Sequence, residues 1–373
     1  MASDRDLERP HDPESLADLE HLRDLPLRSY TPRPAARRQV SEVDRARFPV
    51  VDAHAHLGRW LTGDWAAPDV AELLATMDAA NVVTVANLDG MWGSELRANL
   101  ARYDEAYPGR FVTFAQWDRT LFGEHTDFGE RLAAQVREGA ADGARGLKVW
   151  MDLGLHLRDP ARALVMPDDE RLDPVWQACA DAGLPVLMHT GDPLAFFDPL
   201  DETNERLEEL LENPDWWFGD RSRFPTYDAL ADSFESLVAR RRDVTFLGAH
   251  AAGLAEDLGR LDRMLGAYPN LHADIAARVS ELGRVPRAAA ALIQRHPDRF
   301  LFGSDGVPSV AEEYAVMFRF LETADEHVPY SPDPIPPQGR WAISCLDLPD
   351  DVLAQVYEGN ARRLIPGIGP SRT

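Results

Sequence analysis

Short apolar runs alternate with amphipathic segments from Pro49 to the end of the chain, with a repeat of roughly 30 residues. Eight runs have the length and composition of buried strands. They are residues 50–53, 82–88, 111–116, 146–151, 185–189, 244–249, 271–275 and 300–302. Segments with helical periodicity are residues 70–80, 94–106, 128–141, 172–182, 227–241, 255–267, 287–296 and 349–364. Eight strands alternating with eight helices predict an α/β fold, a (β/α)8 TIM barrel.

Residues 1–47 precede the first apolar run and are polar, rich in Arg, Pro and Asp. One short amphipathic piece lies near residues 13–25, so we expect an N-terminal arm that packs on the body or on a neighbouring subunit. We expect the barrel domain over residues 48–365 and a C-terminal tail over residues 366–373.

Two connections are longer than the few residues usual between a strand and the next helix. The first covers about residues 190–226 and carries five aromatic side chains among acidic residues: Phe196, Phe197, Trp216, Trp217 and Phe218. These predict either a lid or substrate wall, or a small separate core that packs the insertion. The second connection, about residues 306–348, includes a helical stretch over 312–322 and a proline-rich segment over 329–337.

Five residues of metal-binding type stand at the ends of four apolar runs. His54 and His56 close the first run, and both point to one face because side chains alternate along a strand. His189, His250 and Asp305 close the fifth, sixth and eighth runs. The carboxyl ends of barrel strands gather around one mouth, so these side chains should converge there. The pattern predicts a metal site.

Composition and net charge disfavour two classes of binding partner. The 373 residues are 45% hydrophobic, and a net charge of −24 with a pI near 4.8 disfavours nucleic acid or an anionic membrane surface. No apolar run approaches the roughly 20 residues of a membrane helix, and no secretory signal is visible. Cys179 and Cys345 show no motif spacing, so we expect free thiols and a cytoplasmic protein.

The basic residues single out one position. The 39 basic side chains are 38 arginines, a bias common in high-GC bacterial-type sequences, and one lysine, Lys148. Lys148 lies inside an apolar, strand-like run, where an amine, unlike a guanidinium, can lose its proton. It could then act as a base, form a Schiff base or take up carbon dioxide as a carbamate, although a structural ion pair is the alternative.

The order of these motifs resembles the amidohydrolase superfamily. His-x-His on the first strand, His on the fifth and sixth, and Asp on the eighth are its signature. The local sequences around these residues are similar to those of the amidohydrolase-related branch. They are Val-Asp-Ala-His-Ala-His-Leu, Leu-Met-His-Thr-Gly, Leu-Gly-Ala-His and Leu-Phe-Gly-Ser-Asp, with Gly-Asn-Ala-Arg-Arg-Leu near the C-terminus. That branch contains aminocarboxymuconate semialdehyde decarboxylase, related non-oxidative decarboxylases, and ring- or lactone-opening hydrolases.

The resemblance implies a role for each strand-end residue. It implies His54, His56, His189 and Asp305 as metal ligands, and His250 as a general acid/base in mononuclear members or as a ligand in binuclear ones. Lys148 falls where binuclear members carry a carbamylated lysine. We expect one divalent metal, Zn²⁺ first and Mn²⁺, Fe²⁺ or Co²⁺ as alternatives. The other possibility is a second metal bridged by carbamylated Lys148.

These parts predict a metal-dependent hydrolase that acts on a C–N or C–O bond of a small, carboxylate-bearing substrate, with His250, Asp305 and Lys148 as catalytic residues. The same parts permit non-oxidative decarboxylation of an aromatic or unsaturated acid, and a catalytically silent metal-binding barrel is a further alternative. We expect a small-molecule substrate and a homodimer or higher homo-oligomer.

Candidate substrate contacts follow the strand ends. They are Arg59, Trp60, Asn87, Asp89, Trp92, Gln116, Asp118, Trp150, Asp152, Asp192 and Arg278. For each of them the alternative is a residue that packs a loop or lies on the rim. Arg59 and Arg278 are the preferred candidates for a substrate carboxylate, because a guanidinium offers two parallel donors.

Overall fold

The computed structural model describes residues 22–33, 35, 37, 38, 40–191, 193–307 and 311–369. Within these residues the chain forms eight strands in the predicted order, and every strand pair is parallel. The strands are β1 (Val50–Ala55), β2 (Val82–Asn87), β3 (Phe111–Thr113), β4 (Leu147–Val149), β5 (Val186–Met188), β6 (Phe246–Gly248), β7 (Leu271–Asp274) and β8 (Phe300–Leu301). The predicted α/β class with parallel strands is confirmed.

The strands form two sheets, with the orders β1-β2-β3 and β4-β5-β6-β7-β8. Single parallel bridges link the sheets at both edges, Ala115 with Leu147 and Ala55 with Gly306. Apolar side chains from separate strands, including Leu187, Leu247 and Leu301, share one buried cluster. This shared core holds the carboxyl ends of the strands in fixed positions relative to one another.

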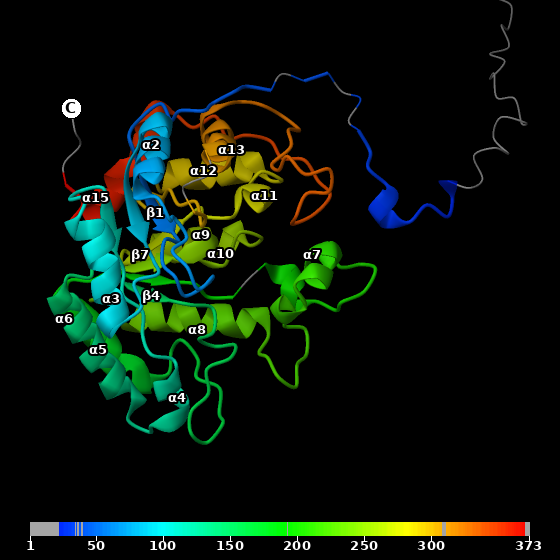
Figure 1. Ribbon diagram of the computed structural model, residues 1–373. Helices are drawn as coiled ribbons and strands as arrows, with labels where there is room; N and C mark the ends of the chain where they lie inside the picture. Colours follow the sequence, from blue (N-terminus) through cyan, green and yellow to red (C-terminus); the bar gives the residue numbers. More distant parts are fainter. Residues whose placement is uncertain are drawn as a thin grey trace, which may run out of the picture.

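The main helices follow the predicted segments closely and lie outside the strands (Figure 1). They are α2 (Val70–Ala80), α3 (Gly93–Leu100), α5 (Phe128–Asp142), α6 (Asp173–Ala182), α8 (Tyr227–Arg240), α10 (Leu258–Ala267), α12 (Pro286–Arg295), α14 (Asp350–Ala354) and α15 (Asn360–Leu364). Two predicted helices are interrupted: π-helical turns over Ala101–Glu105 and Gln355–Gly359 follow α3 and α14. Local signals explain several ends, such as the Asp69 cap of α2 and left-handed Gly183 after α6.

Both long connections carry short helices. Between β5 and α8 lie the 3-10 turns Leu194–Phe197 and Pro214–Trp216 and helix α7 (Leu207–Glu212), and after β8 lies α13 (Ala311–Glu322). The smaller helices α4 (Thr120–Glu124), α9 (Ala249–Ala252) and α11 (Val279–Leu282) follow β3, β6 and β7.

The aromatic cluster of the first connection has two parts. The rings of Phe197 and Phe218 are buried, with centroids 5.4 Å apart, and form a small local core. The rings of Phe196 and Trp216 stack with their centroids 6.1 Å apart, and both line a cavity of about 600 Å³. The wall and the core that the sequence offered as alternatives are therefore both present, in different members of the cluster.

Most of the amphipathic piece near residues 13–25 lies outside the described residues. The rest of the arm runs along the body and then extends beyond α7 (Figure 1). Cys179 and Cys345 are buried and free, as expected. In the described part of the chain, no helix combines the length and the apolar character needed to cross a bilayer.

Candidate metal centre

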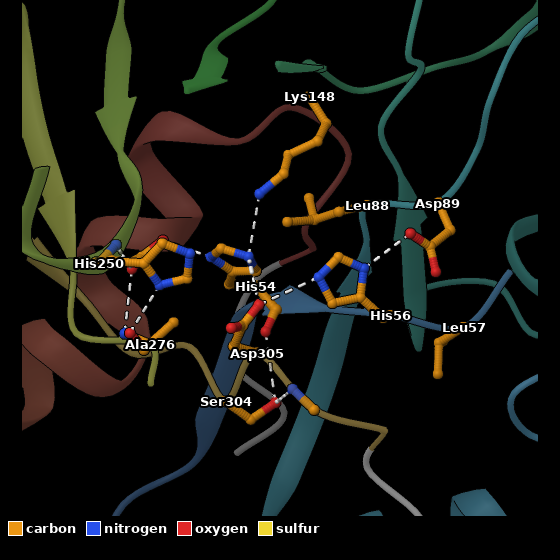
Figure 2. Close-up of polar contacts among 12 residues, drawn as sticks. His54, His56, Leu57, Leu88, Asp89, Lys148, His250, Ala276, Ser304 and Asp305 are labelled. Atoms are coloured by element: carbon orange, nitrogen blue, oxygen red, sulfur yellow. Dashed lines mark hydrogen bonds and ion pairs between the residues drawn. The ribbon is translucent and has the colours of Figure 1, made fainter. Parts of the chain in front are cut away.

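His54, His56 and Asp305 meet at the carboxyl ends of β1 and β8 (Figure 2). Oδ1 of Asp305 lies 3.0 Å from Nε2 of His54 and 3.2 Å from Nε2 of His56. Four ligands about 2.1 Å from a tetrahedral ion are separated by about 3.4 Å, so these three atoms are already close to the spacing that a metal requires. The predicted convergence of the first and eighth strand ends is observed.

A buried carboxylate holds each of these two imidazoles from behind. Nδ1 of His54 lies 2.8 Å from Asp274, and Nδ1 of His56 lies 2.7 Å from Asp89. Each carboxylate can accept a hydrogen bond from Nδ1–H, and this tautomer leaves the lone pair of Nε2 directed toward the centre, where a metal could take it. Asp89 thus supports a ligand-type histidine, whereas the sequence suggested a substrate contact.

Asp274, which the sequence analysis overlooked, also accepts hydrogen bonds from the backbone N–H groups of His250 and Ala276 at 2.7 Å and 3.1 Å. It is the last residue of β7 and lies near the end of the seventh apolar run, and so it follows the same pattern of a metal-type residue at a strand end. That position was the signal that could have identified it.

The backbone around Asp305 is held by a buried acid on β1. Asp52 accepts hydrogen bonds from the hydroxyls of Ser304, at 2.6 Å, and Tyr314, at 2.8 Å. Asp305 itself has φ = 63°, a left-handed conformation that is costly for a residue with a side chain. The hydrogen bonds of Asp52 therefore hold the β8 loop in a strained turn that presents Asp305 to the two histidines.

His250 and His189 form the neighbouring half of the centre. The ring centroid of His250 lies 4.9 Å from that of His54 and 4.3 Å from that of His189. Nδ1 of His250 lies 2.9 Å from the carbonyl oxygen of Ala276. His250 also has positive φ, 59°. His189 thus stands beside His250 and outside the compact group of His54, His56 and Asp305, to which the resemblance assigned it.

Lys148 enters the same cluster from β4. Its buried Nζ lies 3.1 Å from Nε2 of His54 (Figure 2). The same Nζ lies 5.0 Å from the ring centroid of Trp150. Lys148 is thus within reach of the metal-type residues, as its strand-end position predicted.

Burial and charge set the protonation of this cluster. Burial opposes the charged form of His56, but hydrogen bonds with Asp305 and Asp89 outweigh it and raise the pKa of His56 to about 9. Burial lowers the pKa of Lys148 to about 8 and holds that of His250 well below its usual value. Burial alone would raise the pKa of Asp305, yet the neighbouring imidazoles hold it well below the usual range. With a pKa of about 9, His56 carries a proton at neutral pH beside the ionised Asp305. A divalent cation bound to these residues would displace that proton, because an imidazole binds a metal only in its neutral form.

A cavity of about 600 Å³ opens onto the centre. His189, His250 and Asp305 form its metal-side wall, and four aromatic residues form other walls: Trp60, Trp150, Phe196 and Trp216. Three arginines line it as well, namely Arg119, Arg206 and Arg278.

The three arginines differ in their partners. Nε of Arg119 pairs with Asp152 at 2.5 Å, and Arg206 pairs with Glu209 and Glu281. Arg278 is only 7% exposed and donates to the carbonyl oxygen of Ala277 at 2.8 Å. Among the described residues, Arg278 has no carboxylate partner. The sequence did not point to Arg119 or Arg206, because both come from loops without a periodic pattern.

Several proposed substrate contacts lie elsewhere. Arg59 stands outside the cavity lining and forms a two-contact ion pair with Glu95, at 3.0 Å and 2.5 Å. Asn87 is buried and accepts the N–H of Leu57 at 3.1 Å. The others outside the lining are Trp92, Gln116 and Asp118. Asp192 lies outside the described residues. Trp60, Trp150, Asp152 and Arg278 do line the cavity.

A sequence model of the amidohydrolase family matches residues 51–367. The match covers well over half of the chain, from the second residue of β1 to a point beyond α15. The chain belongs to the amidohydrolase family. The resemblance inferred from the strand-end motifs is thus confirmed, while a comparison of this amidohydrolase with curated protein sequences gives no match.

Solved structures resemble this amidohydrolase over most of its length. A TIM-barrel protein from Bordetella bronchiseptica is 19% identical, with a TM-score of 0.50, covering 85% of this chain and 98% of that chain. A 2,6-dihydroxybenzoate decarboxylase from Rhizobium is 16% identical, with a TM-score of 0.50 and the same coverage. A 5-carboxyvanillate decarboxylase from Novosphingobium aromaticivorans, complexed with manganese and 4-hydroxy-3-methoxy-5-nitrobenzoic acid, is 14% identical, with a TM-score of 0.51 and coverage of 87% and 99%. At these identities the likeness concerns the fold alone.

Proposed function

We propose that this amidohydrolase hydrolyses a C–N or C–O bond of a small substrate that carries a carboxylate, in a closed (β/α)8 barrel with one divalent metal. The observation that carries the proposal is that two proton acceptors, Asp305 and His250, face the same cavity as Arg278, a buried guanidinium without a described carboxylate partner. A hydrolase needs a group that takes a proton from water and a group that orients the substrate.

The donor set supports a metal at His54, His56 and Asp305. A carboxylate oxygen and two imidazole nitrogens converge, and Asp274 and Asp89 hold those imidazoles by their other nitrogen. This set suits Zn²⁺ first, with Mn²⁺, Fe²⁺ and Co²⁺ as alternatives. His189, which stands beside His250 and lines the same cavity, is a further candidate ligand. A bound divalent ion would supply Lewis-acid polarisation of water and of the substrate carbonyl.

The chain's own residues carry the proton. Because the carbonyl of Ala276 can only accept, Nδ1 of His250 bears the proton and its Nε2 is an acceptor. In the proposed reaction, water attacks the substrate carbonyl carbon, and Asp305 or His250 takes its proton. The C–N or C–O bond then breaks, and the same proton passes to the departing nitrogen or oxygen. Arg278 holds the substrate carboxylate, and the aromatic walls exclude bulk water.

A second candidate is decarboxylation of an aromatic acid. Four aromatic side chains wall the cavity, and two structural neighbours are named as decarboxylases of hydroxylated benzoates. In this reaction a ring carbon gains a proton, the bond to the carboxylate carbon breaks, and CO₂ leaves while the bond electrons restore the ring.

One experiment separates the two candidates. Metal-loaded protein is incubated with a panel of carboxylate-bearing lactones and cyclic amides and a panel of hydroxybenzoic acids, and products are identified by mass spectrometry. Addition of one water to a lactone or amide supports hydrolysis, whereas loss of CO₂ from a benzoic acid, with no hydrolysis, contradicts it and supports decarboxylation. The variant Asp305→Ala serves as the inactive control for both panels.

A further inference from the structure

The N-terminal arm exposes an unusual concentration of apolar side chains. Of the ten exposed large apolar residues in the described chain, five lie within residues 22–40: Leu22, Leu25, Leu27, Tyr30 and Val40. Every described residue from Leu22 to Arg37 is exposed. A run of solvent-facing apolar side chains is characteristic of a segment that is covered by a partner.

The arm is also basic, in contrast to the rest of the chain. Residues 22–40 contain five arginines and one aspartate, whereas the whole chain carries a net charge of −24. Arg28 and Arg33 are both exposed. The surface that covers this arm should therefore be acidic and should offer exposed apolar side chains.

The insertion after β5 has these two properties. Residues 194–220 contain nine acidic residues and one arginine, and they expose Leu194, Leu211 and Trp216 to 40%, 63% and 40%. Glu212 and Asp215 are exposed beside Leu211 and Trp216, at the end of α7. One chain thus contains both halves of a complementary pair.

The path of the arm favours a second copy over its own insertion. Arg340 donates to the carbonyl oxygen of Tyr30 and pairs with Glu208 of α7 at 2.6 Å, so the arm passes the edge of the insertion. The dark-blue helical turn of the arm, Leu27–Ser29, lies apart from the body, to the right of α7 (Figure 1). The apolar side chains Leu22, Leu25 and Leu27 are exposed. Exchange of two arms about a two-fold axis would cover both insertions with the same contacts.

We propose that the described residues within 22–40 of one chain dock on residues 194–220 of a second copy, and that this exchange forms a homodimer. Trp216 belongs both to this exposed surface and to the lining of the active cavity. The docked arm of the partner therefore lies at the cavity mouth, where it limits access to the metal centre. The proposal is independent of the reaction that the centre catalyses.

Sedimentation velocity of the full chain over a range of concentrations tests the proposal. The wild type should sediment as a dimer of 41.6 kDa chains, and this dimer should dissociate at higher protein concentrations in high salt than in low salt. Reversing the arm charge with Arg28→Glu and Arg33→Glu should weaken association by about tenfold or more, because four unit changes of charge oppose docking. Combining these changes with Glu212→Arg and Asp215→Arg should restore it.

The matched control is Arg131→Glu with Arg137→Glu, an equal charge reversal on the exposed face of α5, which should leave association unchanged. The proposal is overturned by a wild type that is monomeric at every concentration, as an arm folded on its own body would give. An arm variant with wild-type association, or a charge swap without recovery, overturns it as well. The arm variants alter only exposed side chains, so their far-UV circular dichroism spectra should match that of the wild type, which checks their folding independently of association.

Discussion

The metal centre and the far wall of the cavity are built in different ways. At the centre, His54, His56 and Asp305 emerge from strand ends, and each histidine has a buried carboxylate behind it. The far wall, which includes Arg206, comes from loops. The guanidinium of Arg206 pairs with Glu209 and Glu281, which belong to separate segments. Strand ends fix side chains through the sheet, whereas loop residues depend on partners that are distant in sequence. The centre should therefore carry the reaction, and the wall should select the substrate.

Removing the shared carboxylate should have the largest effect. Asp305→Ala deletes the atom that lies between the two Nε2 atoms, so bound metal and essentially all activity should be lost. Elemental analysis of the purified variant, together with turnover, measures both. Asp118→Ala, which alters an acid outside the cavity lining, is the control and should keep its metal; an Asp305 variant with full metal and turnover would place the site elsewhere.

A variant of His250 tests whether this residue binds metal or transfers a proton. With one metal, His250→Ala should keep the metal but lose rate by about 10²–10⁴, the usual contribution of a positioned acid or base. Metal content and kcat are measured on the same sample. Loss of one metal equivalent from a two-metal wild type would instead identify His250 as a ligand.

Lys148→Arg tests the single lysine. The substitution retains a positive charge but adds a bulky planar group next to Nε2 of His54 and cannot form a carbamate, so activity should fall by about 10² while the fold persists. In Lys148→Ala, recovery with bicarbonate and excess metal would indicate a carbamate bridge, and absence of recovery an orienting ammonium. Near wild-type activity in Lys148→Arg would show that Lys148 contributes only packing or positive charge.

The supporting carboxylates should have a smaller effect. Asp274→Asn and Asp89→Asn weaken the hold on Nδ1 of His54 and His56, and changes of this kind cost about 10–100-fold in metal affinity. Competition with a chelator measures the affinity. Asp274 also accepts the N–H of His250, so its variant should lose more rate than the Asp89 variant at saturating metal. Equal affinities in the wild type and both variants would contradict the assigned roles.

Variants of Arg278 and Arg59 compare a guanidinium that lines the cavity with one that lies outside the lining. Arg278→Met removes the buried guanidinium of the cavity and should raise KM for a carboxylate substrate by about tenfold or more, with little change in metal content. Arg59→Met is the matched control, because Arg59 already pairs with Glu95 outside the lining, and its KM should barely change. The opposite ranking would restore Arg59 as the carboxylate site.

The sequence predicts residues at strand ends well and predicts the pairing of loop residues poorly. Two-residue and 3.6-residue periodicities located the strands and helices, and strand ends located His54, His56, Lys148 and Asp305. A register shift between Asp52 and Ala55, beside His54, has no such signal. Neither has the pairing of Arg59 with Glu95 or of Arg206 with Glu281, because the partners meet only after the loops fold.

The most direct test of the metal centre is anomalous diffraction from a crystal of the metal-loaded protein, recorded on both sides of the absorption edge of the bound metal. The account predicts one strong peak within bonding distance, about 2.0–2.2 Å, of Nε2 of His54, Nε2 of His56 and a carboxylate oxygen of Asp305. A crystal in which these three atoms hold no metal, or in which the ion binds elsewhere, would contradict it.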